Sequence, residues 1–199
     1  DIFAAKNPRA PIIRKRANES FAAMANQAMA GSAADYSLFI NDESVAIQKE
    51  WLDELVRACS QDGVSGASPR LLKSGTKLLE NTGYVLGLNG WRAPAFCGQA
   101  NIKLPGQFDW IDCTRDITTL TSSCFIVRNS AVTLAGGMDA ENFSDQMAVA
   151  DLSLRLFDNG QRLLYVPRSN LAGSSELPAP LDGTLEVQMR YLFERKKNS

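Results

Sequence analysis

The alternation of short apolar runs with segments of helical periodicity is the feature that most constrains the fold of this chain. Residues 36–40 (Tyr-Ser-Leu-Phe-Ile) form a compact apolar run, which is typical of a strand buried on both faces of a parallel sheet. Apolar residues then recur at helical spacing over 51–56, and 64–67 is a second apolar run. Strand, helix and strand in this order predict an α/β architecture.

The same patterns place further elements along the chain. We expect a short strand at 11–13, a helix that starts near Asn18 and ends near Gly31, and a short strand at 84–88. Downstream we expect a long strand at 118–127, a helix over 149–156 with Gly160 after its end, and a strand at 163–166 closed by Pro167. An amphipathic helix is expected over 183–199, and the 199 residues are interpreted as one domain.

Composition excludes several classes of function. A net charge of -1 gives no reason to expect binding to nucleic acid or to an anionic membrane. The four cysteines form no C-x-x-C pair, so zinc is not indicated, and reduced thiols favour a cytoplasmic protein, free or peripheral to the inner face of the membrane. The chain has no histidine, which excludes histidine-based acid–base catalysis and metal ligation within it. Its start lacks an initiator Met and signal-peptide features, which indicates a piece of a longer protein.

Two adjacent acids, Asp42 and Glu43, follow directly after the first apolar run. Loops at the carboxyl ends of strands carry the ligand sites of α/β sheets, and two carboxylates there suit Mg²⁺ or Mn²⁺. Such a cation clamps a diphosphate and neutralises charge on a departing nucleotide. The alternative is structural: Asn41 to Ser44 form a turn, and Ser44 or Asn41 caps the next helix.

Eight segments resemble family 2 glycosyltransferases in their order and spacing. They are 18–26 (NESFAAMAN), 34–43 (ADYSLFINDE), 51–56 (WLDELV), 83–87 (GYVLG), 121–128 (TSSCFIVR), 136–139 (GGMD), 151–156 (DLSLRL) and 165–167 (YVP). The resemblance covers about residues 18–176. It looks most like the rhamnosyltransferase-type members that build cell-surface polysaccharide.

The resemblance implies a three-layer GT-A fold with a mixed sheet, and a metal-dependent transfer of sugar from a nucleotide-sugar to a glycan. Asp42 and Glu43 would hold Mg²⁺ or Mn²⁺, while Asn41 and Asp42 would contact the donor. Family members begin with a strand–helix–strand unit that binds the base and ribose of the nucleotide. Nothing before Asn18 is long enough to supply it, so we expect the acceptor-side portion of the domain, with the donor half upstream or absent.

Several positions depart from the family pattern. The acidic motif that supplies the general base matches residues 148–151, and the base position holds Val149. A missing general base costs about 10²–10⁴ in rate. Asp151 and Asp145 are the remaining candidates for this role. Two further family histidines correspond to Asn81 and Gly173.

The acceptor region is expected between the middle of the chain and the long strand. The aromatic residues there either stack on a sugar face or pack in the core and loops; they are Trp91, Phe96 and Trp110. A charged cluster either faces the acceptor, as in the family, or is a solvated loop; its members are Asp109, Asp112, Arg115 and Asp116. Arg155 is expected to pair with a neighbouring carboxylate.

Two functions remain open on the sequence. The first is an enzyme that uses a nucleotide-sugar donor and a glycan acceptor. The second is a non-catalytic relic of that fold, which binds glycan or assists assembly within a larger polysaccharide-synthesis protein. The losses at Val149, Asn81 and Gly173 favour weak or absent catalysis.

Overall fold

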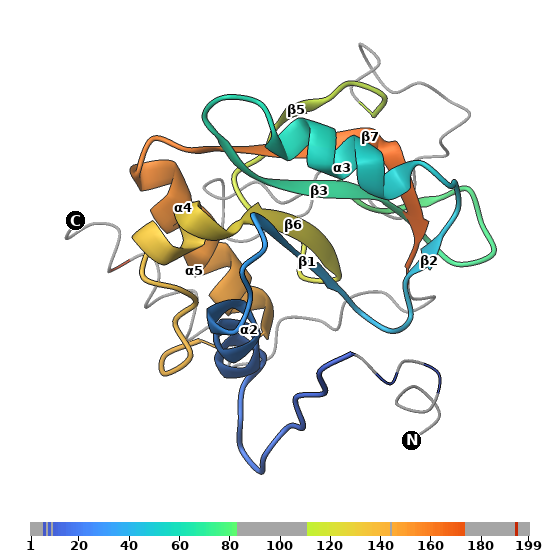
Figure 1. The fold of residues 1–199 in the computed structure, drawn as a ribbon. Helices are drawn as coiled ribbons and strands as arrows, with labels where there is room; N and C mark the ends of the chain where they lie inside the picture. Colours follow the sequence, from blue (N-terminus) through green and yellow to red (C-terminus); the bar gives the residue numbers. More distant parts are fainter. Residues whose placement is uncertain are drawn as a thin grey trace.

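The fold is seen in a computed structural model (Figure 1), which describes residues 6, 8, 10–82, 111–143, 145–173 and 194. The expected strand at 84–88 lies outside these residues, and so does the expected helix over 183–199 apart from Glu194. The elements in chain order are α2 (Phe21–Ala30), β1 (Tyr36–Ile40), β2 (Val45–Ala46), α3 (Trp51–Cys59), β3 (Val64–Leu72), β4 (Leu79–Asn81), β5 (Arg115–Asp116), β6 (Cys124–Arg128), α4 (Asn129–Leu134), α5 (Asp145–Asp158) and β7 (Arg162–Ala172).

One mixed sheet organises the described part of the chain. Its strand order is β1-β6-β3-β7-β2, with β4 paired to β3 and β5 paired to β7. β3 and β7 are parallel, whereas β6 runs antiparallel to both of its neighbours, β1 and β3. It follows that β1, β3 and β7 point the same way and end at one edge of the sheet, called here the carboxyl edge.

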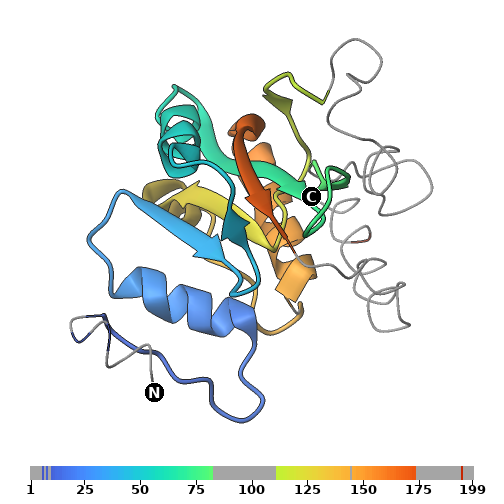
Figure 2. The same ribbon diagram turned by 90° about the vertical axis from the view of Figure 1, so that its right-hand side faces the viewer.

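Helices cover both faces of the sheet, which gives the three layers that the sequence predicts (Figures 1 and 2). On one face α3 packs through Leu55 and Cys59 onto apolar residues of β3, β6 and β7. On the other face α2, α4 and α5 bury a larger apolar cluster around Phe125 and Tyr165. Two separate cores thus hold the central strands from both sides.

Helix α2 is capped at its start by Ser20 and is bonded to the rest of the domain through Asn26. Ser20 caps its start, where the Ser20 Oγ accepts a hydrogen bond from the Ala23 backbone N–H at 3.2 Å. The Asn26 side chain donates to the Met138 carbonyl and accepts from the Met138 N–H, both at 2.8 Å. Met138 is presented by the preceding turn, where Gly137 has a φ of 78°, a conformation that favours glycine.

Two expected strands differ from the structure. Residues 11–13 form no strand, and Ile12 and Ile13 are 40% and 38% exposed. The long strand expected at 118–127 is confined to β6, because side chains bind the backbone of the preceding residues. The Ser153 Oγ accepts from the Leu120 N–H at 3.1 Å, and the Ser68 Oγ accepts from the Thr121 N–H at 3.0 Å.

The last strand is longer than the sequence predicts. Pro167 was expected to close it, but β7 continues to Ala172. The pairing with β3 passes from Pro69↔Val166 directly to Arg70↔Asn170. Residues 167–169 therefore form a bulge, where a proline without an N–H does not interrupt the ladder.

β1 lies at the end of the sheet, where we expected a strand buried on both faces. Four of its residues are half-buried and Ile40 is 44% exposed. β6 pairs with one side of β1, and no described strand pairs with the other. The position at the sheet edge explains the exposure.

Candidate functional site

The carboxylate pair lies at the carboxyl edge, as the sequence predicts. The turn 41–44 follows β1 directly, with the Ser44 N–H donating to the Asn41 carbonyl at 3.2 Å. Asp42 and Glu43 are both exposed on this turn. The chain then enters β2, where Val45 pairs with Ala172 of β7. The turn thus stands beside the end of β7.

The structural alternative for residues 41–44 was a turn whose Ser44 or Asn41 caps the next helix, and only the turn is confirmed. The Ser44 hydroxyl binds the Asn41 side-chain oxygen, so the tetrad is a self-bonded turn. However, α3 begins at Trp51 with Glu50 as its N-cap, and no side chain caps it. The helix-capping role expected for Asn41 or Ser44 is therefore wrong. The two acids between them remain free of a capping role.

Sequence analysis missed one member of the site, Glu80 of β4. Its carboxylate packs against Gly173, just past the end of β7: a Cβ at residue 173 would lie 2.1 Å from the Glu80 Oε2. The Glu80 Oε2 is buried, with no hydrogen-bond partner among the described residues. No motif in the sequence marks this residue. The signal is the pairing of β4 beside β3, which appears only in three dimensions.

The electrostatics of this edge link Glu80 with Glu43. Burial raises the pKa of the Glu80 carboxyl to about 7; nearby Lys73 lowers this pKa, and the negative Glu43 raises it. Glu80 and Glu43 are therefore close enough to interact. Within the described ranges no three His, Cys, Asp or Glu side chains are placed as a metal-binding group. A cation here would need ligands from a phosphate or water as well as from Asp42 and Glu43, which is how Mg²⁺ is usually held.

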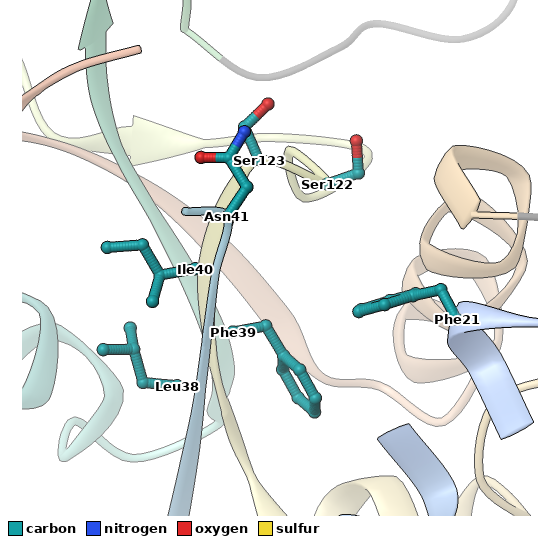
Figure 3. Close-up of a pocket in the computed structure, with 7 residues that line it drawn as sticks. All are labelled: Phe21, Leu38, Phe39, Ile40, Asn41, Ser122 and Ser123. Carbon is teal, nitrogen blue, oxygen red and sulfur yellow. The ribbon is translucent and has the colours of Figure 1, made fainter. Parts of the chain in front are cut away.

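A cavity adjoins the turn along β1. It has a volume of about 510 Å³, and the residues that line it are Phe21, Leu38, Phe39, Ile40, Asn41, Ser122 and Ser123. Figure 3 shows the Phe21 and Phe39 rings on one side of β1, Leu38 and Ile40 on the other side, and the polar Asn41, Ser122 and Ser123 side chains at the upper end. The two rings meet edge to face with centroids 5.8 Å apart. The cavity is therefore apolar along the strand and polar next to Asp42.

The proposed base residues occupy different environments. Asp151 is 2% exposed, and its Oδ2 accepts from the Arg155 Nε at 2.8 Å, so the expected pairing of Arg155 is confirmed. Val149 is fully buried in the apolar core of α5. Asp145 is the first residue of α5. The structure thus brings neither Asp151 nor position 149 into the open edge beside Asp42.

The structure places Arg115 and Asp116 away from the carboxyl edge. The Arg115 guanidinium lies 4.6 Å from the Tyr165 ring centroid and donates to the Thr82 carbonyl at 3.0 Å. Asp116 accepts from Arg162 at 2.9 Å on the surface. Their strand, β5, pairs with β7 at Leu164 and Tyr165. Along β3, whose Ser68 pairs with Tyr165 and whose Leu72 pairs with Ala172, this point lies about 13 Å before the end of β7.

The other residues expected in the acceptor region, Trp91, Phe96, Asp109 and Trp110, lie outside the described residues. Asp112 lies within them, and it accepts a hydrogen bond from Arg70. Among the described residues, none of the helices combines the length and the apolar character that a bilayer crossing needs.

Comparison with curated proteins finds two similar chains, and no family model matches. The chain is 29% identical over 160 residues to the O-antigen biosynthesis protein RfbC of Myxococcus xanthus. The aligned region covers 76% of this chain and 12% of that protein. It is 21% identical over 190 residues to the uncharacterized protein y4gI of Sinorhizobium fredii (strain NBRC 101917 / NGR234), or 94% of this chain and 20% of that protein. The chain thus spans a fifth or less of these relatives.

Comparison with solved structures identifies the fold. GalNAc-T7 with UDP, GalNAc and Mn²⁺ matches 97% of this chain and 38% of its own, with a TM-score of 0.70 and 14% identity. The mannosyltransferase PcManGT of Pyrobaculum calidifontis, in complex with GDP-Man and Mn²⁺, matches 94% of this chain and 45% of its own, with a TM-score of 0.53 and 11% identity. The chain has the fold of GT-A glycosyltransferases, as its sequence predicts.

Proposed function

We propose that this domain takes part in the transfer of a sugar from a nucleotide-sugar donor to a glycan acceptor during cell-surface polysaccharide synthesis. One observation carries the proposal: two adjacent exposed acids, Asp42 and Glu43, stand at the carboxyl edge of a GT-A sheet. The matched solved structures hold a nucleotide or nucleotide-sugar together with Mn²⁺. The similarity to an O-antigen biosynthesis protein supports the polysaccharide context.

Asp42 and Glu43 would hold Mg²⁺ or Mn²⁺, since both offer exposed carboxylate oxygens, which such cations prefer. When bound, the cation would neutralise charge on the departing nucleoside diphosphate. Asn41 and Asp42 would contact the donor at the polar end of the cavity. Glu80 lies at the same edge, and we propose that its carboxyl tunes the charge of the site without binding the cation.

We propose that the donor-binding half of the site comes from polypeptide outside residues 1–199, upstream of Asp1. The longer relatives and the longer solved chains leave room for such a segment. This segment would bind the base and ribose of the nucleotide. The present domain would supply the metal ligands and face the acceptor. A rhamnosyl donor is the first to test. The acceptor residues we propose are Trp91, Trp110, Arg115 and Asp116; the last two would contact a part of the acceptor about 13 Å along the sheet from the turn.

The transfer also requires a base that removes the proton from the acceptor hydroxyl. Val149 cannot accept a proton, and Asp151 would first have to give up its bond to Arg155. Asp145, at the start of α5, is the other candidate. We therefore expect slow transfer.

A non-catalytic function is the second candidate, favoured by the same observation at α5. With Asp151 held by Arg155 and position 149 inside the core, the domain would bind a glycan or assist assembly in a larger protein. The free thiols of Cys59, Cys113 and Cys124 suit a reducing compartment, and we place either function on the cytoplasmic side of the membrane.

Calorimetry and thermal unfolding with Mn²⁺ and UDP, GDP or dTDP test the proposal. Ligand at 100 times its dissociation constant should stabilise the domain by roughly 2.7 kcal/mol. Asp42→Asn and Glu43→Gln should each remove this gain, whereas Asp62→Asn, at an exposed acid away from the turn, should retain it. Absence of any shift, in the protein extended upstream as well as in residues 1–199, would sink the transferase proposal.

A further inference from the structure

A second cavity lies beside the bulge of β7 and is called here the bulge cavity. It has a volume of about 490 Å³, and its polar lining includes Gln48, Glu50, Arg70, Asp112, Arg168 and Asn170. It shares no lining residue with the cavity along β1. Asn170 lies two residues before Ala172, which pairs with Val45 next to the turn 41–44. The bulge cavity therefore begins about 7 Å along β7 from the carboxyl edge.

The bulge explains why this part of β7 turns several side chains into one cavity. The pairing of β3 with β7 skips residues 167–169, so these residues have no partner on β3. In a regular strand consecutive side chains point to opposite faces, whereas a bulge re-aims them. Pro167 and Arg168 are consecutive, and both line the bulge cavity. The buried Pro167 gives the cavity an apolar surface, and the exposed Arg168 gives it a cationic one.

Hydrogen bonds between distant segments of the chain hold the polar walls in place. The Arg70 Nε donates to the Asn170 Oδ1, and the Arg70 Nη1 donates to the Asp112 Oδ1. The Asn170 Nδ2 donates to the Gln48 Oε1 at 2.9 Å, and the Gln48 Nε2 donates to the Arg168 carbonyl. The Arg70 side chain is 11% exposed, so the network fixes its position. The walls are formed before a ligand arrives, which lowers the entropic cost of binding.

Other groups in the lining have bonding capacity that this network does not use. Glu54 also lines the cavity, and its Oε1 accepts from the Arg57 Nη1 at 3.1 Å. The charged groups of Glu50 and Arg168 are exposed and have no bonding partner among the residues that the structure describes. The bulge cavity thus presents carboxylate acceptors together with guanidinium donors.

The mixed charge of the lining determines which ligand it suits. Carboxylates come from Glu50, Glu54 and Asp112, and guanidinium groups come from Arg70 and Arg168. An anion such as phosphate would meet the carboxylates, and a cation would meet the guanidinium groups, so repulsion opposes both. In the described part of the chain no three acidic side chains are placed to hold a metal ion. A hydroxyl group both donates to a carboxylate and accepts from a guanidinium group, so a neutral polyhydroxyl molecule satisfies both kinds of wall.

We propose that the bulge cavity binds a neutral saccharide and holds a glycan chain beside the site of transfer. The apolar surface of Pro167 suits the C–H face of a sugar ring, and the polar walls suit its hydroxyl groups. This inference rests on the proposed function for the source of the ligand, because a glycan that reaches Asp42 and Glu43 would pass about 7 Å from the cavity. The cavity is separate from Arg115 and Asp116, which pair nearer the start of β7.

Nuclear magnetic resonance titration of the 199-residue chain tests the proposal. The probes are short neutral oligosaccharides of rhamnose, glucose, galactose or mannose, added without nucleotide or metal. At least one of them should shift the side-chain NH₂ signals of Gln48 and Asn170 in a saturable way, because these groups line the cavity. The backbone signals of Asp42 and Glu43 should move less. Absence of a saturable shift with every probe would overturn the proposal, and so would shifts confined to the turn 41–44.

Exposed side chains supply a matched set of variants. Glu50→Ala and Arg168→Ala each remove one charged group from the lining and should weaken saccharide binding about tenfold. Lys49→Ala and Asp53→Ala remove nearby charges that do not line the cavity, and they should leave the dissociation constant unchanged. All four side chains are exposed, so each variant should keep the fold. Equal weakening by all four variants would reveal a general charge effect and contradict the proposal.

Titration with other ligands separates the alternatives. Inorganic phosphate or Mg²⁺ that binds at Asn170 more tightly than any saccharide would assign the cavity to an ion and overturn the proposal. Calorimetry with UDP and Mn²⁺, on the 199-residue chain and on the protein extended upstream, separates this inference from the proposed function. Nucleotide binding without a saccharide shift at Gln48 and Asn170 sinks only the glycan site. A saccharide shift without nucleotide binding in either protein sinks only the transferase and leaves a glycan-binding domain.

Discussion

At the scale of single residues, Glu80 carries the most unusual chemistry of the described chain. Its carboxylate is partly withdrawn from water and lies against Gly173, and the negative charge of Glu43 raises its pKa further. The withdrawal raises its pKa to about 7, so Glu80 titrates in the range where histidine usually does, in a chain that has no histidine. A pH dependence near neutrality can therefore be traced to a carboxyl group.

Stability should fall as pH rises through the pKa of Glu80. Its folded pKa of about 7 exceeds the ordinary value of 4.5, so the folded state binds the proton more tightly. The contribution is complete below pH 4.5 and is lost above pH 7. For a half-exposed group we expect about 1 kcal/mol after allowance for solvent screening. Urea unfolding of Glu80→Gln from pH 4.5 to 8 should lack this loss, whereas Asp62→Asn should follow the wild-type curve.

The Asp151–Arg155 pair should be a large contributor to stability. Asp151 is 2% exposed and the Arg155 side chain 20% exposed, and Arg155 also donates to the Ala135 carbonyl. Removal of one partner leaves a buried charge without its counter-ion, which costs about 3 kcal/mol. Asp151→Ala should show this loss in equilibrium urea unfolding, and Asp151→Leu with Arg155→Met should recover part of it. A loss below about 1 kcal/mol for Asp151→Ala would mean that Asp151 is dispensable to the fold.

At the scale of elements, the two hydrogen bonds of Asn26 join α2 to the glycine turn before Met138. Asn26→Ala should remove both bonds and leave the Met138 N–H and C=O without their partner, at a cost of about 2 kcal/mol. Chemical denaturation measures this loss. Asn26→Asp keeps the acceptor for the Met138 N–H and should lose less. A variant Asn26→Ala as stable as wild type would show that α2 is held by its apolar contacts alone.

Elements with strong local signals could be predicted from sequence. The helical spacing of Trp51, Leu55 and their neighbours predicts α3, and the glycine after α5 marks its end at the right place. The predictions fail where a strand depends on a pairing partner that is distant in sequence. Residues 11–13 have strand composition but no described strand to pair with, and β7 passes Pro167 because the bulge beside β3 accommodates it.

At the scale of the whole molecule, the positions of some site residues could be predicted from the sequence, and those of others depend on the tertiary fold. The position of Asp42 and Glu43 follows from a strand-end rule that sequence can express. Glu80 could not be found this way, because it reaches the site through the pairing of β4 with β3 and the absence of a side chain at Gly173. The distance of Arg115 from the carboxyl edge likewise depends on which end of β7 its strand joins.

Metal binding should depend on the nucleotide. Asp42 and Glu43 are two exposed carboxylates, and the described residues offer no third ligand placed to complete a site. Mn²⁺ alone should therefore shift the melting temperature by less than about 1 °C, and EDTA should leave it unchanged. Mn²⁺ with a nucleoside diphosphate should give a larger shift than either component alone. A strong shift with Mn²⁺ alone would point to a preformed metal centre outside the described ranges.

The strand order has a consequence for how the chain reaches its fold. Of the described strand pairs, only β3 with β4 joins strands that are neighbours in sequence. The partners of β1 and β3 in the pairs β1–β6 and β3–β7 lie about a hundred residues later in the chain. Closing such distant pairs makes folding slow, and it leaves early strands exposed to wrong partners. During synthesis, β1 must remain without its partner until β6 has emerged from the ribosome, which makes this segment a natural target for chaperones.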